Sequence, residues 1–338
     1  MNRKHFLSLF TGAGIVGSIP SRAENPDPVP PVIPRYLKPG DVIGITSPAG
    51  YITVEDIQPA IQQIKEWGLK VKIGASIGRR YFGFGGTDEE RYRDMQRMLD
   101  DDSIQAIMCA RGGYGVVRII DRLNFEKFVR KPKWIIGFSD VTILHAHINS
   151  RYNIASIHSK MCNSFPKDWN KALDVQRQTI FSIRDALMGK RSEFSFSSSP
   201  ANRQGIAEGV LVGGNLKLLE TLAGTASDLN TTDKILFLED TGEYLYSIDR
   251  MLWNLKRTHK IARLKGLVLG GFKIKPDDPG EEFGIALEEI VMSKMRDYSF
   301  PVCFNFPVGH QPNNFALKCG VRYRLNVQQS TCLLEEII

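Results

Sequence analysis

A serine, a glutamate and a histidine stand where the sequence predicts that strands end. Ser139 follows the apolar run 134–138 and directly precedes a helical stretch. Glu239 follows the apolar run 235–238, and His310 lies in a loop rich in Gly, Pro and Asn after a further short strand. A serine hydroxyl is a poor nucleophile at neutral pH and needs a base, and the base needs an acid that fixes its tautomer. Together the three residue types predict nucleophilic catalysis, with Ser139 as nucleophile, His310 as base and Glu239 as its orienting acid.

Each residue also has a structural interpretation that the sequence leaves open. Ser139 suits the N-cap of the helix that follows it, a common position for serine. Glu239 suits a helix cap or a surface ion pair, and a loop histidine such as His310 is more often a bystander. The turn at Ser139 also differs from the nucleophile turn of α/β-hydrolases, because Val141 stands where the second glycine of that motif belongs.

A glycine-rich loop, Arg111-Gly112-Gly113-Tyr114-Gly115, follows the predicted strand 104–109. Glycines allow backbone N–H groups to approach a phosphate or a developing oxyanion closely. The loop lacks the Lys-Ser/Thr pair of a P-loop and the full GxGxxG spacing, so it does not identify a nucleotide site. Arg111 suits a clamp for a substrate carboxylate, because a guanidinium fork matches that geometry, or a salt bridge that supports the loop.

The histidines and cysteines show no metal-binding pattern. His145 and His147 are two residues apart on a predicted helix, so their rings point to different sides and cannot share a metal there. His158 has no acidic neighbour, and no HExxH motif is present. The five cysteines have no zinc spacing, and we expect most to be buried and free, with a Cys303–Cys319 disulfide as the alternative. The sequence therefore does not favour a catalytic metal.

The composition is that of an ordinary globular protein. Of 338 residues, 42% are hydrophobic and 24% charged, which excludes a disordered chain, a collagen-like repeat and a coiled coil. The net charge is +7, or +4 without the three basic residues of the leader described below. A charge this weak and dispersed does not favour nucleic acid as a partner. At roughly 150 residues per domain, the length suggests two domains.

The candidate loops need a sheet that places them together. Short apolar runs predict strands at 41–46, 69–73, 104–109, 134–138 and 155–158. The sequence predicts helices between them, one beginning after Thr53 and one beginning at Thr87, which forms a capping box with Glu90. Alternating strands and helices predict a parallel sheet with helices on both faces, in an N-terminal domain at 36–165. In such sheets, reactive groups collect at the carboxyl ends of the strands.

The second half predicts a mixed α/β domain at 206–338. Strand-like runs lie at 210–212, 234–238, 266–269 and 302–304, and helical patterns lie between them. Residues 166–205 carry one helical stretch between Pro- and Ser-rich segments, which suits a linker between the two domains. The fold class expected is therefore α/β, with a flavodoxin- or amidotransferase-like parallel sheet, a second mixed domain and the site in the cleft between them.

The N-terminus predicts export. Residues 1–23 combine a basic start, an apolar stretch and small residues at a cleavage position, which is typical of a signal peptide. Residues 24–35 are proline-rich and predict an extended spacer. The rest of the sequence contains no stretch of about 18 apolar residues, so we expect no integral membrane segment. We therefore expect a periplasmic or otherwise exported protein.

Six segments, taken in order, resemble the LD-carboxypeptidases, the serine peptidase family that includes microcin-immunity peptidases. The resemblance spans about residues 36–328, nearly the whole chain after the leader. The segments are Ser47-Pro48-Ala49-Gly50; Arg111 to Gly115; Gly137-Phe138-Ser139-Asp140; Gly209 with Gly213-Gly214-Asn215-Leu216; Leu238-Glu239-Asp240 with Asp249-Arg250; and Gly309-His310. The resemblance implies a nucleophile domain, a C-terminal domain with the other two triad members, and no cofactor.

The resemblance also implies roles and a substrate. Ser139, Glu239 and His310 take the triad roles, and backbone N–H groups of Asp140 and of the 111–113 loop, with Gly112 and Gly113, take the oxyanion. Family substrates are murein tetrapeptides, from which the terminal D-alanine is removed after a residue with an L-configured centre. The sequence does not determine whether that third residue is lysine or diaminopimelate. The alternatives are a peptidase or amidase for another peptidyl small molecule and a murein-binding protein without turnover. A homodimer is compatible with the family. The leader sets this chain apart from cytosolic members that recycle cell-wall fragments.

Overall fold

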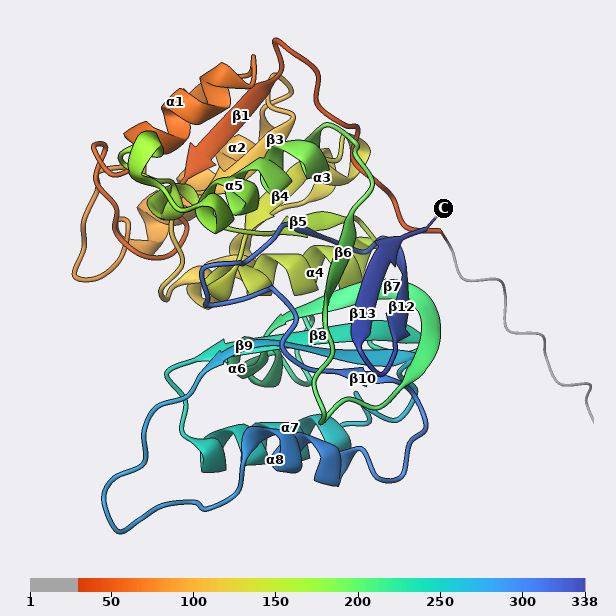
Figure 1. Cartoon of the computed structure of the whole chain (residues 1–338). Helices are drawn as coiled ribbons and strands as arrows, with labels where there is room; N and C mark the ends of the chain where they lie inside the picture. The colour runs from red at the N-terminus through yellow and green to blue at the C-terminus, as the bar shows by residue number, and fades with distance from the viewer. Residues whose placement is uncertain (1–29, 338) are drawn as a thin grey trace, which may run out of the picture. The chain divides into compact units, whose positions relative to one another are not determined.

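The computed structural model describes residues 30–337, so the predicted leader and half of the proline-rich spacer lie outside the described residues. Two sheets organise the described chain (Figure 1). One has six strands in the order β11-β5-β4-β3-β1-β2, and the other has seven in the order β10-β9-β8-β7-β12-β13-β6. The α/β class predicted from the alternating pattern is confirmed.

Five strands of the first sheet are parallel and come from the first half of the chain. They are β1 (Val42–Thr46), β2 (Lys70–Ile73), β3 (Ala106–Cys109), β4 (Trp134–Gly137) and β5 (Ser156–His158). Each lies within two residues of its predicted bounds. Their order 2-1-3-4-5 is that of flavodoxin-like sheets, in which ligands bind beyond the carboxyl ends of the strands.

Helices cover both faces of this sheet. Two of them pack on one face and three on the other, because alternate side chains of each strand point to opposite faces. The first face holds α1 (Gln58–Glu66) and α5 (Asp174–Leu187), and the second holds α2 (Asp88–Asp100), α3 (Glu126–Arg130) and α4 (Thr142–Tyr152). Short 3-10 helices connect them: η1 (Val116–Arg118), η2 (Ile120–Arg122), η3 (Ser139–Val141), η4 (Cys162–Ser164) and η5 (Trp169–Lys171).

The two predicted helix starts have different outcomes. At α2 the capping box is confirmed, because Glu90 N donates to Thr87 Oγ1 at 3.2 Å and Thr87 N donates to the Glu90 carboxylate at 2.9 Å. At α1 the analogous pair exists, with Asp56 N donating to Thr53 Oγ1 at 3.0 Å, but the helix begins only at Gln58. The prediction of a helix directly after Thr53 was wrong, since that pair closes a turn that precedes the helix.

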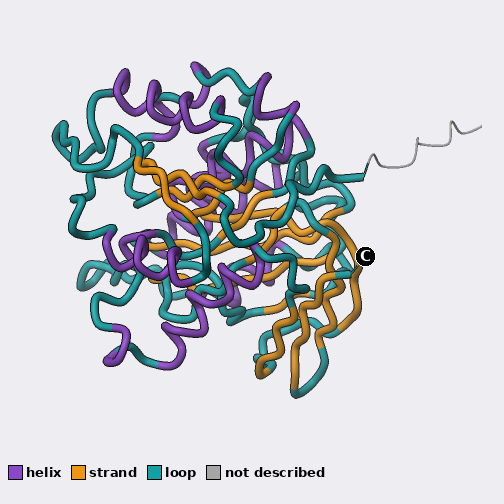
Figure 2. The backbone as a smooth tube through the Cα atoms, turned by 90° about the horizontal axis from the view of Figure 1, so that it is seen from above, coloured by secondary structure: helices purple, strands orange, loops and turns teal. Residues whose placement is uncertain are grey.

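The second sheet combines parallel and antiparallel strands. Its parallel part is β7 (Gly205–Asn215), β8 (Lys234–Thr241), β9 (Gly266–Lys273) and β10 (Val302–Cys303), and its antiparallel part is β12 (Arg322–Val327), β13 (Thr331–Glu336) and β6 (Glu193–Ser197). One face packs against α6 (Leu216–Thr221), α7 (Leu245–Arg257) and α8 (Leu287–Lys294). Figure 2 shows the antiparallel strands beside the C-terminus.

Helix α4 lies between the two sheets (Figure 1). Its residues from Thr142 to Asn149 are all buried, which explains why its sequence shows no polar face. Asn215, at the end of β7, donates its backbone N–H to Thr142 Oγ1 at 3.1 Å. A Cβ atom on Gly214 would lie only 2.6 Å from the same oxygen. The carboxyl end of β7 therefore contacts the start of α4, immediately after the predicted nucleophile.

Several pairings join segments that the sequence did not connect. β11 (Leu317–Cys319), from the second half of the chain, pairs antiparallel with β5, and β6, from the expected 166–205 linker, pairs with β13. Val32, within the proline-rich spacer, pairs with Ile154. These strands are short or polar on one face, so single-segment patterns did not reveal them.

The structure describes the state of the cysteines and the length of the apolar helices. All five cysteines are buried and free, as expected, and the alternative Cys303–Cys319 disulfide is absent from the described chain. Among residues 30–337, no helix combines the length and the apolar character needed to cross a bilayer.

Candidate active site

Ser139 occupies a sharp turn between β4 and α4. The strand ends at Gly137, and η3 begins at Ser139 with a φ of 60°. A left-handed backbone is rare for a non-glycine residue and marks a turn that its surroundings hold in place. Neither η3 nor α4 receives a side-chain cap hydrogen bond. The helix-cap interpretation of the serine therefore does not describe this turn, and its partly exposed hydroxyl is not used as a cap.

The strand end before Ser139 is fixed by hydrogen bonds to one carbonyl. The Gly137 carbonyl accepts from Ser159 N at 3.0 Å and from His145 Nε2 at 2.9 Å. Burial lowers the pKa of His145 to about 4, so its ring is neutral at pH 7 and donates through Nε2. A Cβ on Gly137 would lie 2.9 Å from a Val141 methyl group, so only glycine fits there.

The glycine-rich loop lies directly against Ser139. A Cβ built on Gly112 would lie 2.9 Å from Cβ and 3.1 Å from Oγ of Ser139. The Gly112 carbonyl accepts a hydrogen bond from Gly50 N at 2.9 Å, which joins this loop to the loop after β1. Gly113 has a φ of 104°, a conformation that favours glycine. The structure thus brings together the two segments that the sequence singled out separately.

Three backbone N–H groups at this turn are free to bind a ligand. Those of Gly112, Gly113 and Asp140 donate to no acceptor within residues 30–337. Buried or partly buried N–H groups without a protein acceptor are uncommon. Donors grouped beside a serine hydroxyl can stabilise an oxyanion formed on an attacked carbonyl.

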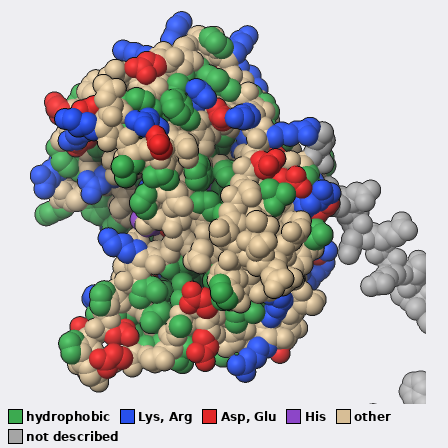
Figure 3. Space-filling view, in the orientation of Figure 1, with side chains coloured by type: hydrophobic (Ala, Val, Ile, Leu, Met, Phe, Trp, Pro, Cys, Tyr) green, Lys and Arg blue, Asp and Glu red, His purple; other side chains and the backbone are tan. Residues whose placement is uncertain are grey.

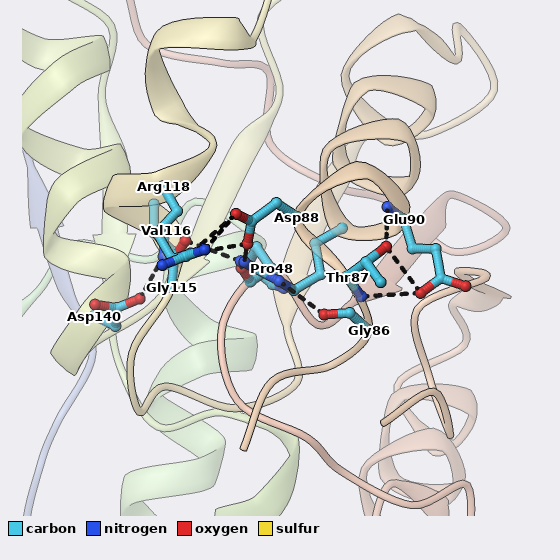
Figure 4. A network of polar contacts seen from close by, with 10 residues as sticks. Pro48, Gly86, Thr87, Asp88, Glu90, Gly115, Val116, Arg118 and Asp140 are labelled. Atoms are coloured by element: carbon cyan, nitrogen blue, oxygen red, sulfur yellow. Dashed lines mark hydrogen bonds and ion pairs between the residues drawn. The ribbon is translucent and has the colours of Figure 1, made fainter. Parts of the chain in front are cut away.

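The Asp140 side chain organises the same loop, a role that the sequence did not predict. Its Oδ2 accepts from Val116 N at 2.8 Å, at the end of the glycine-rich loop (Figure 4). Burial raises the pKa of Asp140 to about 6, although the hydrogen bonds from Val116 and Gly115 and the charge of Arg91 oppose that rise. Asp140 therefore fixes the loop through its carboxylate, while its backbone N–H remains free.

Arg91 ties three loops together from helix α2. Its guanidinium is fully buried and donates to the carbonyls of Pro48, Gly86 and Gly115, the last at 2.9 Å, and it pairs with Asp88. Figure 4 shows these acceptors gathered around one point beside Asp88. The sequence analysis did not single out Arg91, because an arginine on a helix with many charges looks like a surface residue.

Glu239 and His310, which the sequence predicted as acid and base, are joined by hydrogen bonds. His310 Nδ1 donates to Glu239 Oε2 at 2.6 Å, and the backbone N of His310 donates to the same oxygen at 3.2 Å. The Glu239 side chain is fully buried, whereas the His310 side chain is 20% exposed. A carboxylate can only accept, so the proton lies on Nδ1 and the lone pair on Nε2. This tautomer is the one that a general base requires.

The histidine loop approaches Glu239 through a glycine. Gly309 has a φ of 101°, and a Cβ there would lie 2.5 Å from Cβ of Glu239. Gly309 N donates to Asn314 Oδ1 at 2.8 Å, and Gly271 N donates to the Val308 carbonyl at 2.8 Å. The loop is thus held against the end of β9 at the position that brings His310 onto the carboxylate.

The two halves of the site meet through Phe138. Its ring centre lies 4.9 Å from that of His310, and it is the residue next to Ser139 in the chain. Within the described residues, Ser139 and His310 form no hydrogen bond with each other. Catalytic hydrogen bonds are often long before substrate binds. A cavity of about 640 Å³ reaches His310, and Figure 3 shows histidine atoms in a hollow of the surface.

Arg111 is exposed at the mouth of the glycine-rich loop. Its Nη1 donates to the Tyr51 carbonyl at 2.9 Å. Among residues 30–337 it has no carboxylate partner, so the salt bridge considered as an alternative does not form. The remaining guanidinium N–H groups are available to a ligand.

The sequence analysis gave no role to three further residues near the site. Lys160, two residues after β5, donates to the Gln311 carbonyl at 2.7 Å. Buried His158 packs edge-on against Phe237, and burial lowers its pKa well below the usual value, so it stays neutral. Asp240 accepts from Lys217 N at 2.9 Å, and burial raises its pKa to about 6. Their common signal is a position at or just beyond a strand end.

The other histidines bind separate partners. His147 Nδ1 lies 2.8 Å from Ser227 Oγ, whereas His145 contacts the Gly137 carbonyl. Among the described residues, no group of three or more His, Cys, Asp or Glu side chains is arranged to hold a metal ion. The two residues that the sequence placed on different sides of α4 therefore have different structural roles.

Two family models match this chain. The LD-carboxypeptidase N-terminal domain matches residues 43–159, and the LD-carboxypeptidase C-terminal domain matches residues 208–325. A Bacillus subtilis (strain 168) protein named "Probable murein peptide carboxypeptidase" is 30% identical over 309 residues, which cover 89% of this chain and 94% of that protein.

Solved structures show the same fold. The muramoyltetrapeptide carboxypeptidase from Oxalobacter formigenes has a TM-score of 0.77 at 27% identity, covering 87% of this chain and 98% of its own. The microcin C7 self immunity protein MccF in its wild-type apo state has a TM-score of 0.78 at 21% identity, covering 92% and 99%. At that identity the second likeness concerns the fold alone.

Proposed function

This chain belongs to the LD-carboxypeptidase family, and from that premise we propose that it is a serine carboxypeptidase that removes the terminal D-alanine from murein tetrapeptides. The observation that carries the proposal is the 2.6 Å hydrogen bond between His310 Nδ1 and the buried Glu239 carboxylate, beside the turn that exposes Ser139. A histidine oriented by a buried carboxylate in this way is the arrangement of acyl-transfer enzymes.

In the first half of the proposed reaction, Ser139 attacks the peptide carbonyl. Its Oγ forms a bond to the carbonyl carbon as His310 Nε2 takes the hydroxyl proton, and Glu239 stabilises the imidazolium. The negative charge moves to the carbonyl oxygen, where the free N–H groups of Asp140 and Gly112 or Gly113 can bind it. His310 then gives its proton to the leaving nitrogen, and D-alanine departs from an acyl-enzyme.

In the second half, water replaces D-alanine. His310 removes a proton from the water that attacks the acyl-enzyme carbonyl, and returns it to Ser139 Oγ as the tripeptide leaves. We propose that Arg111 binds the terminal carboxylate of the substrate, because its guanidinium has free N–H groups close to the glycine-rich loop. No step requires a cofactor.

Mass spectrometry of muropeptides incubated with the purified protein tests this function. The expected result is the loss of one alanine from tetrapeptides and no change in pentapeptides. A panel that adds a peptidyl-nucleotide and ordinary L,L-peptides separates this reaction from the microcin-immunity type. Cleavage of the peptidyl-nucleotide without cleavage of tetrapeptide contradicts the murein assignment. Absence of both turnover and labelling of Ser139 by a fluorophosphonate, which reacts with activated serines, supports a binding protein instead.

We also propose that the enzyme acts on murein outside the inner membrane. The support is the pattern of residues 1–23, which lie outside the described part of the chain. Cell fractionation together with N-terminal sequencing tests it, with a mature N-terminus near residue 24 in the periplasmic fraction as the expected result. Light scattering on the purified protein distinguishes a monomer from the homodimer that is compatible with the family.

A further inference from the structure

Lys160 lies beside the nucleophile because of the register of two paired strands. Gly137 of β4 pairs with His158 of β5, and Ser139 and Lys160 each lie two residues further along the chain. Both residues therefore leave the sheet at the same carboxyl edge. Nζ of Lys160 lies 5.6 Å from the ring centre of Phe138, the residue next to the nucleophile. Its ammonium group thus lies against the residue that precedes Ser139 in the chain.

The ammonium group of Lys160 has donors that the protein does not use. It donates one hydrogen bond, to the Gln311 carbonyl at 2.7 Å, and forms no ion pair within residues 30–337. Burial lowers the pKa of Lys160, and the charge of Glu239 opposes that shift, although the Glu239 carboxylate is itself hydrogen-bonded to His310. An ammonium has three N–H groups, so two remain in a partly buried position. An unpaired cation in such a position favours an anionic ligand.

Lys160 also lines a cavity of about 390 Å³. Among the described residues that line this cavity, Lys160 carries a charge and the others are neutral. Polar and apolar groups alternate on its walls, and examples are Asn163, Gln176, Thr179, Phe165 and Ile180. The loop that carries the catalytic histidine contributes a further wall two residues after it. The volume is in the range of small-ligand sites, about 300–1,000 Å³, and suits a chain of several carbon atoms with a polar end.

Building on the proposed function, we propose that this Lys160 cavity binds the side chain of the third stem residue and selects diaminopimelate over lysine. The diaminopimelate side chain ends in a carboxylate and an ammonium, whereas the lysine side chain ends in an ammonium alone. The two free N–H groups of Lys160 donate to the carboxylate, and amide oxygens such as that of Asn163 accept from the ammonium. A lysine side chain instead places a second positive charge against Lys160, and like charges repel. The terminal alanine, with one methyl group, is too small to fill this cavity.

The test compares three tetrapeptides that differ only in the third side chain. They carry diaminopimelate, diaminopimelate with its side-chain carboxylate amidated, and lysine, and kcat/KM is measured for the full-length protein and for Lys160→Met. Wild-type protein is expected to prefer the free acid by at least about 10-fold. Lys160→Met is expected to lower kcat/KM on the acid by about 10- to 100-fold, the usual loss for one hydrogen bond to a charged group. The amide peptide is expected to change by less than about 3-fold, and the lysine peptide is expected to be cleaved faster than by the wild-type protein because the like charge is gone.

Two further variants separate recognition from folding. Lys160→Arg keeps the positive charge and is expected to retain a preference for the acid over the amide. Lys167→Met removes an equal charge from an exposed position in the same segment, where the lysine side chain is 84% exposed, and is expected to leave all three rates unchanged. Thermal unfolding of each variant shows whether it is folded.

Binding measurements keep this proposal distinct from the proposed function. Calorimetric titration of the acid and amide peptides into Ser139→Ala protein, with and without Lys160→Met, needs no turnover. The proposal is overturned if Lys160→Met reduces binding and kcat/KM equally for all three peptides, which is the expectation for a purely structural lysine or for recognition of the terminal carboxylate. It is also overturned if the acid-to-amide ratio is unchanged. A wild-type protein that binds the acid selectively and releases no alanine contradicts the proposed function alone.

Discussion

The surroundings of Ser139 and His310 differ. Backbone groups surround Ser139, whereas one buried carboxylate orients His310. The serine turn is set by a left-handed residue, a glycine loop and three free N–H groups, with Asp140 and Arg91 fixing the loops from behind. The histidine is set by Glu239, which accepts two hydrogen bonds on one oxygen. The serine side therefore depends on the geometry of several loops, whereas His310 is oriented by one carboxylate that lies 71 positions away in the chain.

This difference predicts how substitutions on each side should affect stability and activity. Damage to the loops should alter both stability and activity, because backbone positions move together with the residues that hold them. Damage to the Glu239–His310 pair should alter chemistry with little effect on substrate binding, because the carboxylate touches the base and not the substrate.

The largest expected effect is that of Ser139→Ala. Removing the nucleophile should lower kcat by roughly 10³- to 10⁶-fold, and leave the remaining catalysis to the N–H groups and substrate positioning. Release of D-alanine from tetrapeptide measures it, and circular dichroism verifies folding. Ser293→Ala, which removes a hydroxyl bonded to its own helix, is the matched control and should keep wild-type activity. Near-normal turnover by Ser139→Ala contradicts the assignment.

Glu239→Gln is expected to have the next largest effect. The amide oxygen can still accept from His310 Nδ1, but the negative charge that stabilises the imidazolium is lost, so kcat should fall by about 10²- to 10⁴-fold. KM should change little. The same substitution at Glu220, whose carboxylate accepts from Asn254 at 2.9 Å on the far side of α6, serves as control. A large rise in KM at unchanged kcat would falsify the view that Glu239 acts through the base.

Arg91→Lys tests the loop scaffold. Lysine keeps the charge but cannot donate to carbonyls on three loops at once, so buried acceptors at Pro48 and Gly115 lose their donors. We expect the free energy of unfolding to fall by about 3–5 kcal/mol, the range for breaking a buried charged network. Urea unfolding measures this value. Arg93→Lys, two residues away on the exposed face of α2, should change stability by less than about 0.5 kcal/mol. Equal effects from both variants contradict the role of Arg91.

The smallest expected effect concerns pH. Burial raises the pKa of Asp140 and of Asp240 to about 6, above the value of about 4 that aspartate has in an unfolded chain. The folded protein therefore binds more protons than the unfolded chain between pH 4 and pH 6, and the contribution of each carboxyl to stability is lost as pH rises through that interval. The expected loss is on the order of 2 kcal/mol for each group.

Urea titrations at pH 4.5, 5.5 and 7 measure that slope. Asp140→Asn and Asp240→Asn, which keep an acceptor for the backbone N–H groups, should each flatten part of it. Asp102→Asn, an exposed carboxyl, should leave the slope unchanged. A wild-type slope that neither buried variant alters shows that both carboxyls are already ionised at pH 4.5.

The comparison also shows what the sequence could predict. Ser139, Gly112 and the capping box at Thr87 could be predicted from the sequence. In each case the residues that form the pattern lie close together in the chain. Glu239 and His310 were predicted as orienting acid and base from their residue types and strand-end positions, and the family resemblance implied the same roles. The patterns alone could not bring two residues 71 positions apart to 2.6 Å.

Other features depend on pairings that single segments do not encode. β11 adds to the first sheet from the second half of the chain, and Lys160 acquires its place only through the register of β4 with β5. Arg91 reads as a surface residue until the loops close over it. In each case tertiary contacts, and not local preference, decide the role of the residue.

The central claim is that Ser139 and His310 act as one unit, and the double variant tests it most directly. Turnover of tetrapeptide is measured for Ser139→Ala, His310→Ala and the protein carrying both changes. If the hydroxyl is useful only when the imidazole takes its proton, the double variant is about as slow as the slower single variant. If the two losses multiply, the residues contribute independently and the account is wrong.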